Sequence, residues 1–395
     1  MKSLGTTISR VFSKRGLAIA GTALLLGGCS VIPKTGPSQT TGPVATPTPE
    51  PSATALPSDA TRHRVALLVP MGGNTSAVGQ SLANATTMAL LDTNANNLRI
   101  TTYDTSKGAG AAARRAIADG NKLILGPLLA ENVPAVQAAA RPAKVPAIAF
   151  SNDTRVASAD VFLMGHVPEQ SIRRSVAYAR ARGSNNFAAL VPEGTYGQRS
   201  FDALTSALSD YGGNLIGSAQ YARGNTSIVS AAQRLRAAGG YDTVLIADGA
   251  RLAVQAAGEV RSSGAEGTRI LGTELWSGES VLTRSGAING AIFSAVSDGR
   301  YKRFADSYEA RFGNKPYRIA TLGYDSVLLT LRVARDWRVG RNFPTSMMFD
   351  RGGFLGVDGP FRFGRDGIAE RALEVREVRS NSVVPVEAAP TSFGG

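Results

Sequence analysis

Short apolar runs alternate with amphipathic stretches along the chain from residue 64 onward. Each run is nearly all apolar and is bounded by Gly, Pro, Asn or Asp. This pattern is typical of strands that are buried on both faces of a parallel sheet. We therefore predict strands at 65–69, 98–103, 123–125, 147–150, 187–191, 243–247 and 291–293.

The stretches between these runs have the spacing of helices. Phe201, Leu204, Leu208 and Tyr211 fall on one face of a helix, and Gly212-Gly213 marks its end. Similar stretches predict helices near 171–182 and 227–238. Repeated strand–helix units imply right-handed crossovers and an open α/β sheet.

The order of these units predicts two sheets. The first set of strands ends near 161–163, and "GHVPEQS" precedes a second set. After 293 come two helices, about 300–312 and 318–338, and then β signals in "GVDGPFRFGRDG" and "RALEVREV". We predict a two-lobed α/β fold over 62–388, each lobe an open, mostly parallel sheet flanked by helices. The first lobe takes about 62–165 and 297–340, and the second about 166–296 and 341–388.

The N-terminal segment has the pattern of a targeting sequence. Residues 1–15 carry four basic and no acidic side chains, and an apolar run then leads to Cys29. Leu26-Gly27-Gly28-Cys29 resembles the lipobox of bacterial lipoproteins, which implies a signal peptide at 1–28 and lipidation of Cys29. The alternative is a free thiol in an uncleaved anchor. By the same resemblance, Ser30 implies sorting to the outer membrane. Residues 29–61 are rich in Pro, Thr and Ser and predict a disordered tether.

Composition excludes several classes of site. The single cysteine rules out an intrachain disulfide and a zinc site built on cysteines. The formal net charge of +13 is spread along the chain, so it reflects either general arginine usage or attraction to an anionic partner such as a cell-wall polymer or lipid phosphate. No pattern for nucleic-acid binding is present.

Catalytic and cofactor motifs are also missing. His63 and His166 are the only histidines, and no nucleophile elbow, paired metal-ligand spacing or Walker A motif occurs. Gly108-Ala109-Gly110 imitates a dinucleotide motif, but it is more simply the start of an Ala-rich helix. We predict no enzyme activity, no cofactor and no metal.

Polar residues that directly follow predicted strands are the candidate ligand contacts, because ligands of open α/β sheets bind at the carboxyl ends of strands. Ser151, Asn152 and Asp153 follow the fourth strand, where a helix cap is an equal alternative. Tyr196 in "EGTYGQRS" follows a strand of the second lobe. Tyr221 and Trp276 are lesser candidates, for which packing in the core is the alternative. Carboxylates at similar positions are Asp104, Glu131, Glu193, Asp248, Glu274 and Asp325.

Five segments in register resemble the type I periplasmic binding fold of leucine/isoleucine/valine receptors: "VALLVPMGGNTSAVGQSLANATTMAL", "LILGPLLAENVPAV", "VPAIAFSND", "VPEGTYGQRSFDAL" and "GVDGPFRFGRDG". The resemblance implies two lobes, three crossings between them, and a cleft that closes by a hinge motion. In the amino-acid receptors, adjacent serines after the third strand hold the ligand carboxylate. Leu129 and Ala130 stand at those positions here, followed by Glu131, so binding of a free amino acid in that way is not expected.

The "GPLL" turn also resembles the outer-membrane lipoprotein activators of penicillin-binding proteins. That resemblance implies a non-enzymatic protein that stimulates a peptidoglycan synthase by direct contact from the periplasmic face of the outer membrane. Those activators carry an N-terminal helical-repeat domain, which this chain replaces with the tether. The alternative is a periplasmic solute-binding lipoprotein of an ABC importer for amino acids, amides or similar small polar ligands.

Overall fold

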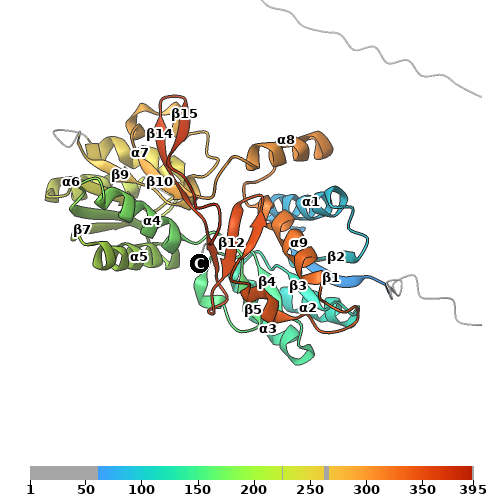
Figure 1. Ribbon diagram of the computed structural model, residues 1–395. Coiled ribbons are helices and arrows are strands. Elements are labelled where there is room, and N and C mark those ends of the chain that lie inside the picture. The colour runs from blue at the N-terminus through green and yellow to red at the C-terminus, as the bar shows by residue number, and fades with distance from the viewer. Residues whose placement is uncertain (1–60, 225, 262–266, 394–395) are drawn as a thin grey trace, which may run out of the picture. The chain divides into compact units, whose positions relative to one another are not determined.

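The computed structural model describes residues 61–224, 226–261 and 267–393. These residues form two sheets of mostly parallel strands, each covered by helices on both faces (Figure 1). The predicted two-lobed α/β fold is therefore confirmed. The predicted signal peptide at 1–28, Cys29 and nearly all of the tether lie outside the described residues.

The first lobe is built on a five-stranded parallel sheet. Its spatial order is β2-β1-β3-β4-β5, and its strands are β1 (His63–Val69), β2 (Leu98–Asp104), β3 (Leu123–Leu125), β4 (Ala147–Ala149) and β5 (Val161–Leu163). Along β1, Val65, Leu67 and Val69 face one side of the sheet, and Ala66 and Leu68 face the other. Both sides are apolar because helices cover both.

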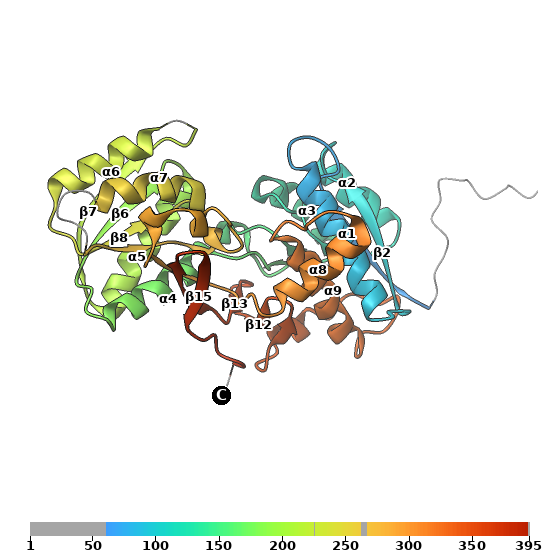
Figure 2. The ribbon, with the colours of Figure 1, turned by 90° about the horizontal axis from the view of Figure 1, so that it is seen from above.

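Five helices surround this sheet: α1 (Ser76–Asp92), α2 (Ala109–Ala118), α3 (Val133–Ala140), α8 (Tyr301–Phe312) and α9 (Ala320–Ala334). Helices α1 and α9 lie side by side and share one core with Leu67 (Figure 2). Helices α2 and α3 pack on the opposite face against Leu68. The chain therefore returns to the first lobe for α8 and α9, as the sequence pattern predicts.

The second lobe contains a seven-stranded sheet in the order β15-β14-β10-β9-β8-β6-β7. The first five strands in sequence are parallel, and the last two are antiparallel to their neighbours. The strands are β6 (Asn186–Pro192), β7 (Asn214–Tyr221), β8 (Thr243–Ile246), β9 (Arg269–Leu271), β10 (Ile292–Ala295), β14 (Glu374–Arg379) and β15 (Ser382–Glu387).

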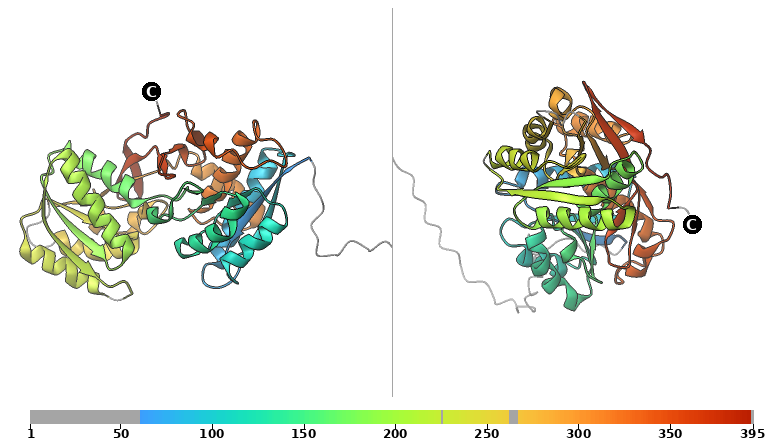
Figure 3. Two further views of the ribbon diagram at one scale, coloured as in Figure 1. Left: turned by 90° about the horizontal axis from the view of Figure 1, so that it is seen from below. Right: turned by 90° about the vertical axis from the view of Figure 1, so that its left-hand side faces the viewer.

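Helices cover both faces of the second sheet (Figure 3). Helices α4 (Pro168–Arg180) and α5 (Thr195–Tyr211) pack with Phe187 and Val191 of β6. Helices α6 (Ser227–Ala238) and α7 (Ala250–Arg261) pack with Leu190 from the opposite face of the same strand.

A third sheet consists of three short antiparallel strands, which come after α9 and before β14 in the chain. They are β11 (Phe354–Gly356), β12 (Gly359–Phe363) and β13 (Ala369–Arg371). Phe354, Phe361 and Phe363 are buried in the same core as β1 and α9. The predicted boundary placed all of 341–388 in the second lobe. The packing divides this segment, because β11–β13 join the core of the first lobe and only β14 and β15 join the second sheet.

The chain passes between the lobes three times, at 164–167, at 296–300 and at 372–373. These crossings bring residues distant in sequence together at the root of the cleft. Across 61–393, apart from 225 and 262–266, no helix combines the length and apolar character needed to cross a membrane.

Candidate functional site

A cavity of about 300 Å³ lies between the two lobes. Its wall combines residues that follow β3, β4, β5 and β9 with the start of α9, so it lies at the carboxyl ends of strands. The lining residues are Leu128, Phe150, Ser151, Asn152, His166, Glu274, Leu275, Ser277, Glu279, Arg318 and Ile319. Apolar side chains alternate with polar and charged ones, which is the usual make-up of a site for a small ligand.

Two predicted ligand contacts lie on the wall contributed by the first lobe. Ser151 and Asn152 follow β4 directly, and Ser151 is almost fully buried. The Ser151 hydroxyl accepts a hydrogen bond from the Asp153 amide at 3.0 Å, so its own hydrogen can still be donated. Ser151 is therefore held in place by the chain and keeps one donor.

The turn after β3 reaches the cavity through one apolar side chain. Gly126 begins the turn with a φ of +102°, and a Cβ there would lie 2.2 Å from the Leu68 carbonyl oxygen, so only glycine fits. Leu128 lines the cavity, whereas Leu129 and the 3₁₀ turn η1 (Ala130–Asn132) are not among its lining residues. Glu131 is exposed. The predicted contacts Leu129, Ala130 and Glu131 are thus one residue or more beyond the part of the turn that lines the cavity.

The opposite wall carries Glu274, in the 3₁₀ turn η4 (Glu274–Trp276) after β9. Its Oε1 accepts a hydrogen bond from the Tyr196 hydroxyl at 3.0 Å, and the same hydroxyl lies 3.0 Å from Thr273 Oγ1. Glu274 Oε2 is buried without a hydrogen-bond partner. Burial raises the pKa of Glu274 to about 7. Burial also raises the pKa of Tyr196 well above its usual value.

Tyr196 therefore supports the wall from behind Glu274. The sequence predicted that Tyr196 faces the cleft. Its side chain lies next to the cavity wall, but its hydroxyl already contacts Thr273 and Glu274 of the second lobe. The Arg223 guanidinium lies over the Tyr196 ring at 5.4 Å and restrains it further.

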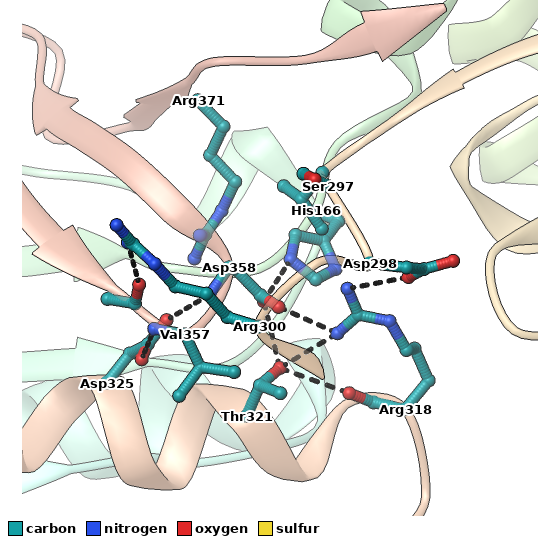
Figure 4. Close-up of polar contacts among 12 residues, drawn as sticks. His166, Ser297, Asp298, Arg300, Arg318, Thr321, Asp325, Val357, Asp358 and Arg371 are labelled. Carbon is teal, nitrogen blue, oxygen red and sulfur yellow. Dashed lines mark hydrogen bonds and ion pairs between the residues drawn. The ribbon is translucent and has the colours of Figure 1, made fainter. Parts of the chain in front are cut away.

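His166 and Arg318 connect the cavity to a buried charged cluster at the crossings between the lobes (Figure 4). His166 Nε2 lies 2.8 Å from Asp358 Oδ2, and Arg318 Nη1 donates to Asp358 Oδ1 at 2.7 Å. Thr321 Oγ1 donates to Asp358 as well, at 2.8 Å. Burial, followed by the charge of Arg371, lowers the pKa of His166.

Two carboxyl groups in this cluster have opposite protonation preferences. Burial, followed by the nearby Asp358 carboxylate, raises the pKa of Asp325 to about 7. Burial alone would raise the pKa of Asp358 too, but Arg318, His166 and Arg371 outweigh it and lower that pKa. Asp325 accepts backbone hydrogen bonds from Val357 at 2.6 Å and Asp358 at 3.2 Å. The ionised Asp358 is thus the counter-charge for the buried cations.

The remaining sequence candidates have structural partners elsewhere. Asp153 caps the 3₁₀ turn η3 (Thr154–Val156) and forms an ion pair with Arg155 at 2.7 Å, so the capping alternative describes its contacts. Tyr221 is buried and donates to Asp248 at 2.8 Å. Trp276 is buried in the core of the second lobe and donates to the Asp248 carbonyl oxygen at 2.8 Å.

Three of the polar lining residues carried little signal in the sequence. Glu274 was one of several carboxylates near strand ends, His166 was noted only as one of two histidines, and Arg318 had no local signal. Among the described residues, no group of three or more His, Cys, Asp or Glu side chains is placed to hold a metal ion.

The periplasmic binding protein family model matches residues 63–382, which is most of the chain. The chain belongs to the periplasmic binding protein family. Members of this family bind ligands, are generally not enzymes, and work outside the cytoplasm in the periplasm.

Solved structures similar to this periplasmic binding protein share its fold at low sequence identity. The leucine-binding protein LivK of Thermotoga maritima superposes with a TM-score of 0.65 at 19% identity, over 83% of this chain and 98% of LivK. LivJ of Streptococcus pneumoniae, in complex with isoleucine, gives 0.64 at 16% identity, over 83% and 100%. A solute-binding protein of R. palustris, in complex with benzoate, gives 0.62 at 15% identity, over 85% and 98%.

One curated sequence relative is an uncharacterized protein of Rickettsia prowazekii (strain Madrid E). It is 29% identical over 136 residues, and the match spans 34% of this chain and 36% of the relative. The chain therefore aligns with about a third of that protein's length.

Proposed function

We propose that this periplasmic binding protein binds a small polar organic solute between its lobes and delivers it to an ABC importer. The observation that carries the proposal is the cavity of about 300 Å³, whose wall combines Ser151 and Asn152 of the first lobe with Glu274 of the second. A ligand that touches both walls stabilises the closed arrangement, because its contacts are complete only when the lobes approach.

The chemistry of the wall indicates the class of solute. Glu274 presents an acidic group whose Oε2 has no hydrogen-bond partner, so a ligand ammonium, amide or hydroxyl would satisfy it. Phe150 and Ile319 supply apolar surface for the rest of the ligand. The cavity is at the small end of the range for ligand pockets. Isoleucine and benzoate, which relatives of the same fold hold, are of this size class.

A thermal-shift screen with amino acids, amides and aromatic carboxylates tests this proposal. A ligand at 100 times its Kd should stabilise the fold by about 2.7 kcal/mol. Glu274→Ala and Ser151→Ala should each abolish or weaken the shift, while Glu131→Ala, at an exposed position outside the cavity, should leave it unchanged. If no compound in the screen shifts the melting temperature, the solute-binding proposal fails.

A second candidate function is activation of a penicillin-binding protein, as the "GPLL" turn suggested. The observation in its favour is that the turn contributes Leu128 and no hydroxyl group to the cavity. Recovery of a peptidoglycan synthase with the protein from detergent extracts, together with faster glycan polymerisation, would support it. If the synthase is not recovered and its rate is unchanged, the solute-binding function stands alone.

We also propose that Cys29 is lipidated and anchors the protein to the outer membrane. The support is the sequence Leu26-Gly27-Gly28-Cys29-Ser30 together with the periplasmic setting of the family. Radiolabelled palmitate should enter the wild-type protein and not Cys29→Ser, and membrane fractionation should place the label in the outer membrane. A wild-type protein without label would contradict the anchor and leave the solute-binding proposal intact.

A further inference from the structure

A second, larger cavity of about 460 Å³ lies outside the cleft and shares no lining residue with the cavity between the lobes. Its lining includes Arg173 and Arg174 of α4, Arg362 of β12, and Phe393 of the C-terminal segment. It is referred to below as the arginine-lined cavity. Both lobes and the C-terminal segment contribute to it.

Two of these arginines are stacked on aromatic rings that also line the cavity. The Arg173 guanidinium carbon lies 5.1 Å from the centre of the Tyr211 ring, and that of Arg362 lies 4.8 Å from the Phe393 ring. Stacking fixes the plane of a guanidinium group and leaves its N–H edge free to donate. The two stacks therefore hold oriented hydrogen-bond donors at positions contributed by different lobes.

Positive charge dominates the residues that line this cavity. They include four arginines, the three named above and the buried Arg371, against one carboxylate, Glu370. The exposed arginines form ion pairs with Asp210, Glu387 and Glu370. Side chains in these pairs are 31–52% exposed, and ion pairs at such exposure contribute little to stability, so a multivalent anion can compete for the guanidinium groups.

We propose that the arginine-lined cavity is a binding site for a phosphate group. A phosphate monoester carries close to two negative charges and three acceptor oxygens, which matches several guanidinium donors better than a single carboxylate does. The phosphomonoester has two possible sources, a soluble metabolite or the headgroup of phosphatidic acid in a lipid surface. This site is independent of the solute site in the cleft.

Calorimetric titration with sn-glycerol 3-phosphate, and sedimentation with phosphatidic acid vesicles, separate these sources. Saturable binding of glycerol 3-phosphate indicates a soluble ligand, and binding to phosphatidic acid but not phosphatidylcholine vesicles indicates a lipid. Arg362→Gln should weaken binding about tenfold. Glu370→Gln should tighten it several-fold, because it removes the carboxylate that competes for Arg362 at 2.7 Å.

Arg332→Gln is the matched control, since Arg332 is similarly exposed and pairs with Asp350 outside this cavity. It should leave binding unchanged. The opposite signs expected for Arg362→Gln and Glu370→Gln cannot arise from general damage to the fold. The proposal is overturned if neither phosphate source binds, if Arg332→Gln weakens binding as much as Arg362→Gln, or if Glu370→Gln has no effect.

Discussion

Asp358 is fully buried and receives hydrogen bonds from side chains of two different segments of the chain. Arg318 and Thr321 reach it from the start of α9, and His166 contacts it from the first crossing between the lobes. Arg371 lies close enough to influence its charge. A buried charge is tolerated only when it is paired and hydrogen-bonded, so this carboxylate and its cations depend on each other.

We predict that Asp358→Asn destabilises the protein by about 3–5 kcal/mol, because the buried Arg318 and Arg371 lose their shared counter-charge. Guanidinium denaturation at neutral pH measures the change. Asp306→Asn serves as the control, since Asp306 is exposed and pairs only with Lys302 in the same helix. A loss of less than about 1 kcal/mol for Asp358→Asn would show that water, rather than the ion pairs, satisfies the arginines.

An ordinary ion-paired carboxylate adds stability as pH rises, whereas Glu274 removes stability as pH rises. Its folded-state pKa is raised to about 7, above the ordinary value of 4.5, so ionisation favours the unfolded chain. The protein therefore loses stability as pH rises from about 4.5 through 7. We predict that Glu274→Gln is close to neutral at pH 4 and stabilises the ligand-free protein by about 1–3 kcal/mol at pH 8.

Urea denaturation of the wild type, Glu274→Gln and Glu279→Gln at both pH values tests this sign. Glu279 lies on the same loop and is exposed, so its variant should follow the wild type. A destabilised Glu274→Gln at pH 8 would mean that the ionised carboxylate is stabilised by the cavity, contrary to the effect of burial.

At the scale of elements, the strands that sequence predicts well are those with uninterrupted apolar runs. The seven predicted strands all occur, whereas β9 was missed because Ile270 and Leu271 are its only apolar residues and form too short a run to be recognised. The sequence also did not predict that β11–β13 pack in the first lobe. Its alternating pattern shows that one face is buried, but the pattern does not show which lobe covers that face.

The residues of the candidate site also fall into those that the sequence could predict and those that it could not. Ser151 and Asn152 could be predicted because they follow a strand directly, and ligands bind at such strand ends. Arg318 and His166 could not, since they meet at Asp358 only after segments about 150 residues apart pack together. Tyr221 is the last residue of β7, but its hydroxyl donates to Asp248, and this partner is visible only in the fold.

Gly165 shows how closely two elements approach at the floor of the cleft. It lies in the first crossing, after β5, and a Cβ at this position would lie 2.1 Å from the Ser151 carbonyl oxygen. Backbone atoms cannot yield as a flexible side chain can. We predict that Gly165→Ala destabilises the protein by about 1–3 kcal/mol and weakens ligand binding, because it displaces Ser151.

Thermal melts and ligand titrations of Gly165→Ala and Gly249→Ala provide the comparison. Gly249 has open space around its Cβ position, so its variant should keep both stability and affinity within a narrow range of the wild type. If Gly165→Ala behaves like Gly249→Ala, the first crossing moves freely relative to Ser151.

At the scale of the whole molecule, the crossings are tied to both lobes by charge. Asp298 in the second crossing forms an ion pair with Arg376 of β14, and its Oδ1 lies 3.7 Å from Arg318 Nη2 in the first lobe. Neither Asp298 Oδ1 nor Arg318 Nη2 has a hydrogen-bond partner. Relative motion of the lobes changes this distance directly, so Asp298 is placed to respond to the opening of the cleft.

We predict that Asp298→Asn lowers amide hydrogen-exchange protection at 164–167 and 296–300, because the crossings lose a charge that both lobes contact. Protection in β1 and β6 should remain, since the cores of the two lobes do not involve Asp298. Asp92→Asn, which removes an ion pair with Arg311 between two helices of the first lobe, controls for the loss of charge alone. Unchanged exchange at both crossings would show that the apolar cores, rather than the charged cluster, set the relative mobility of the lobes.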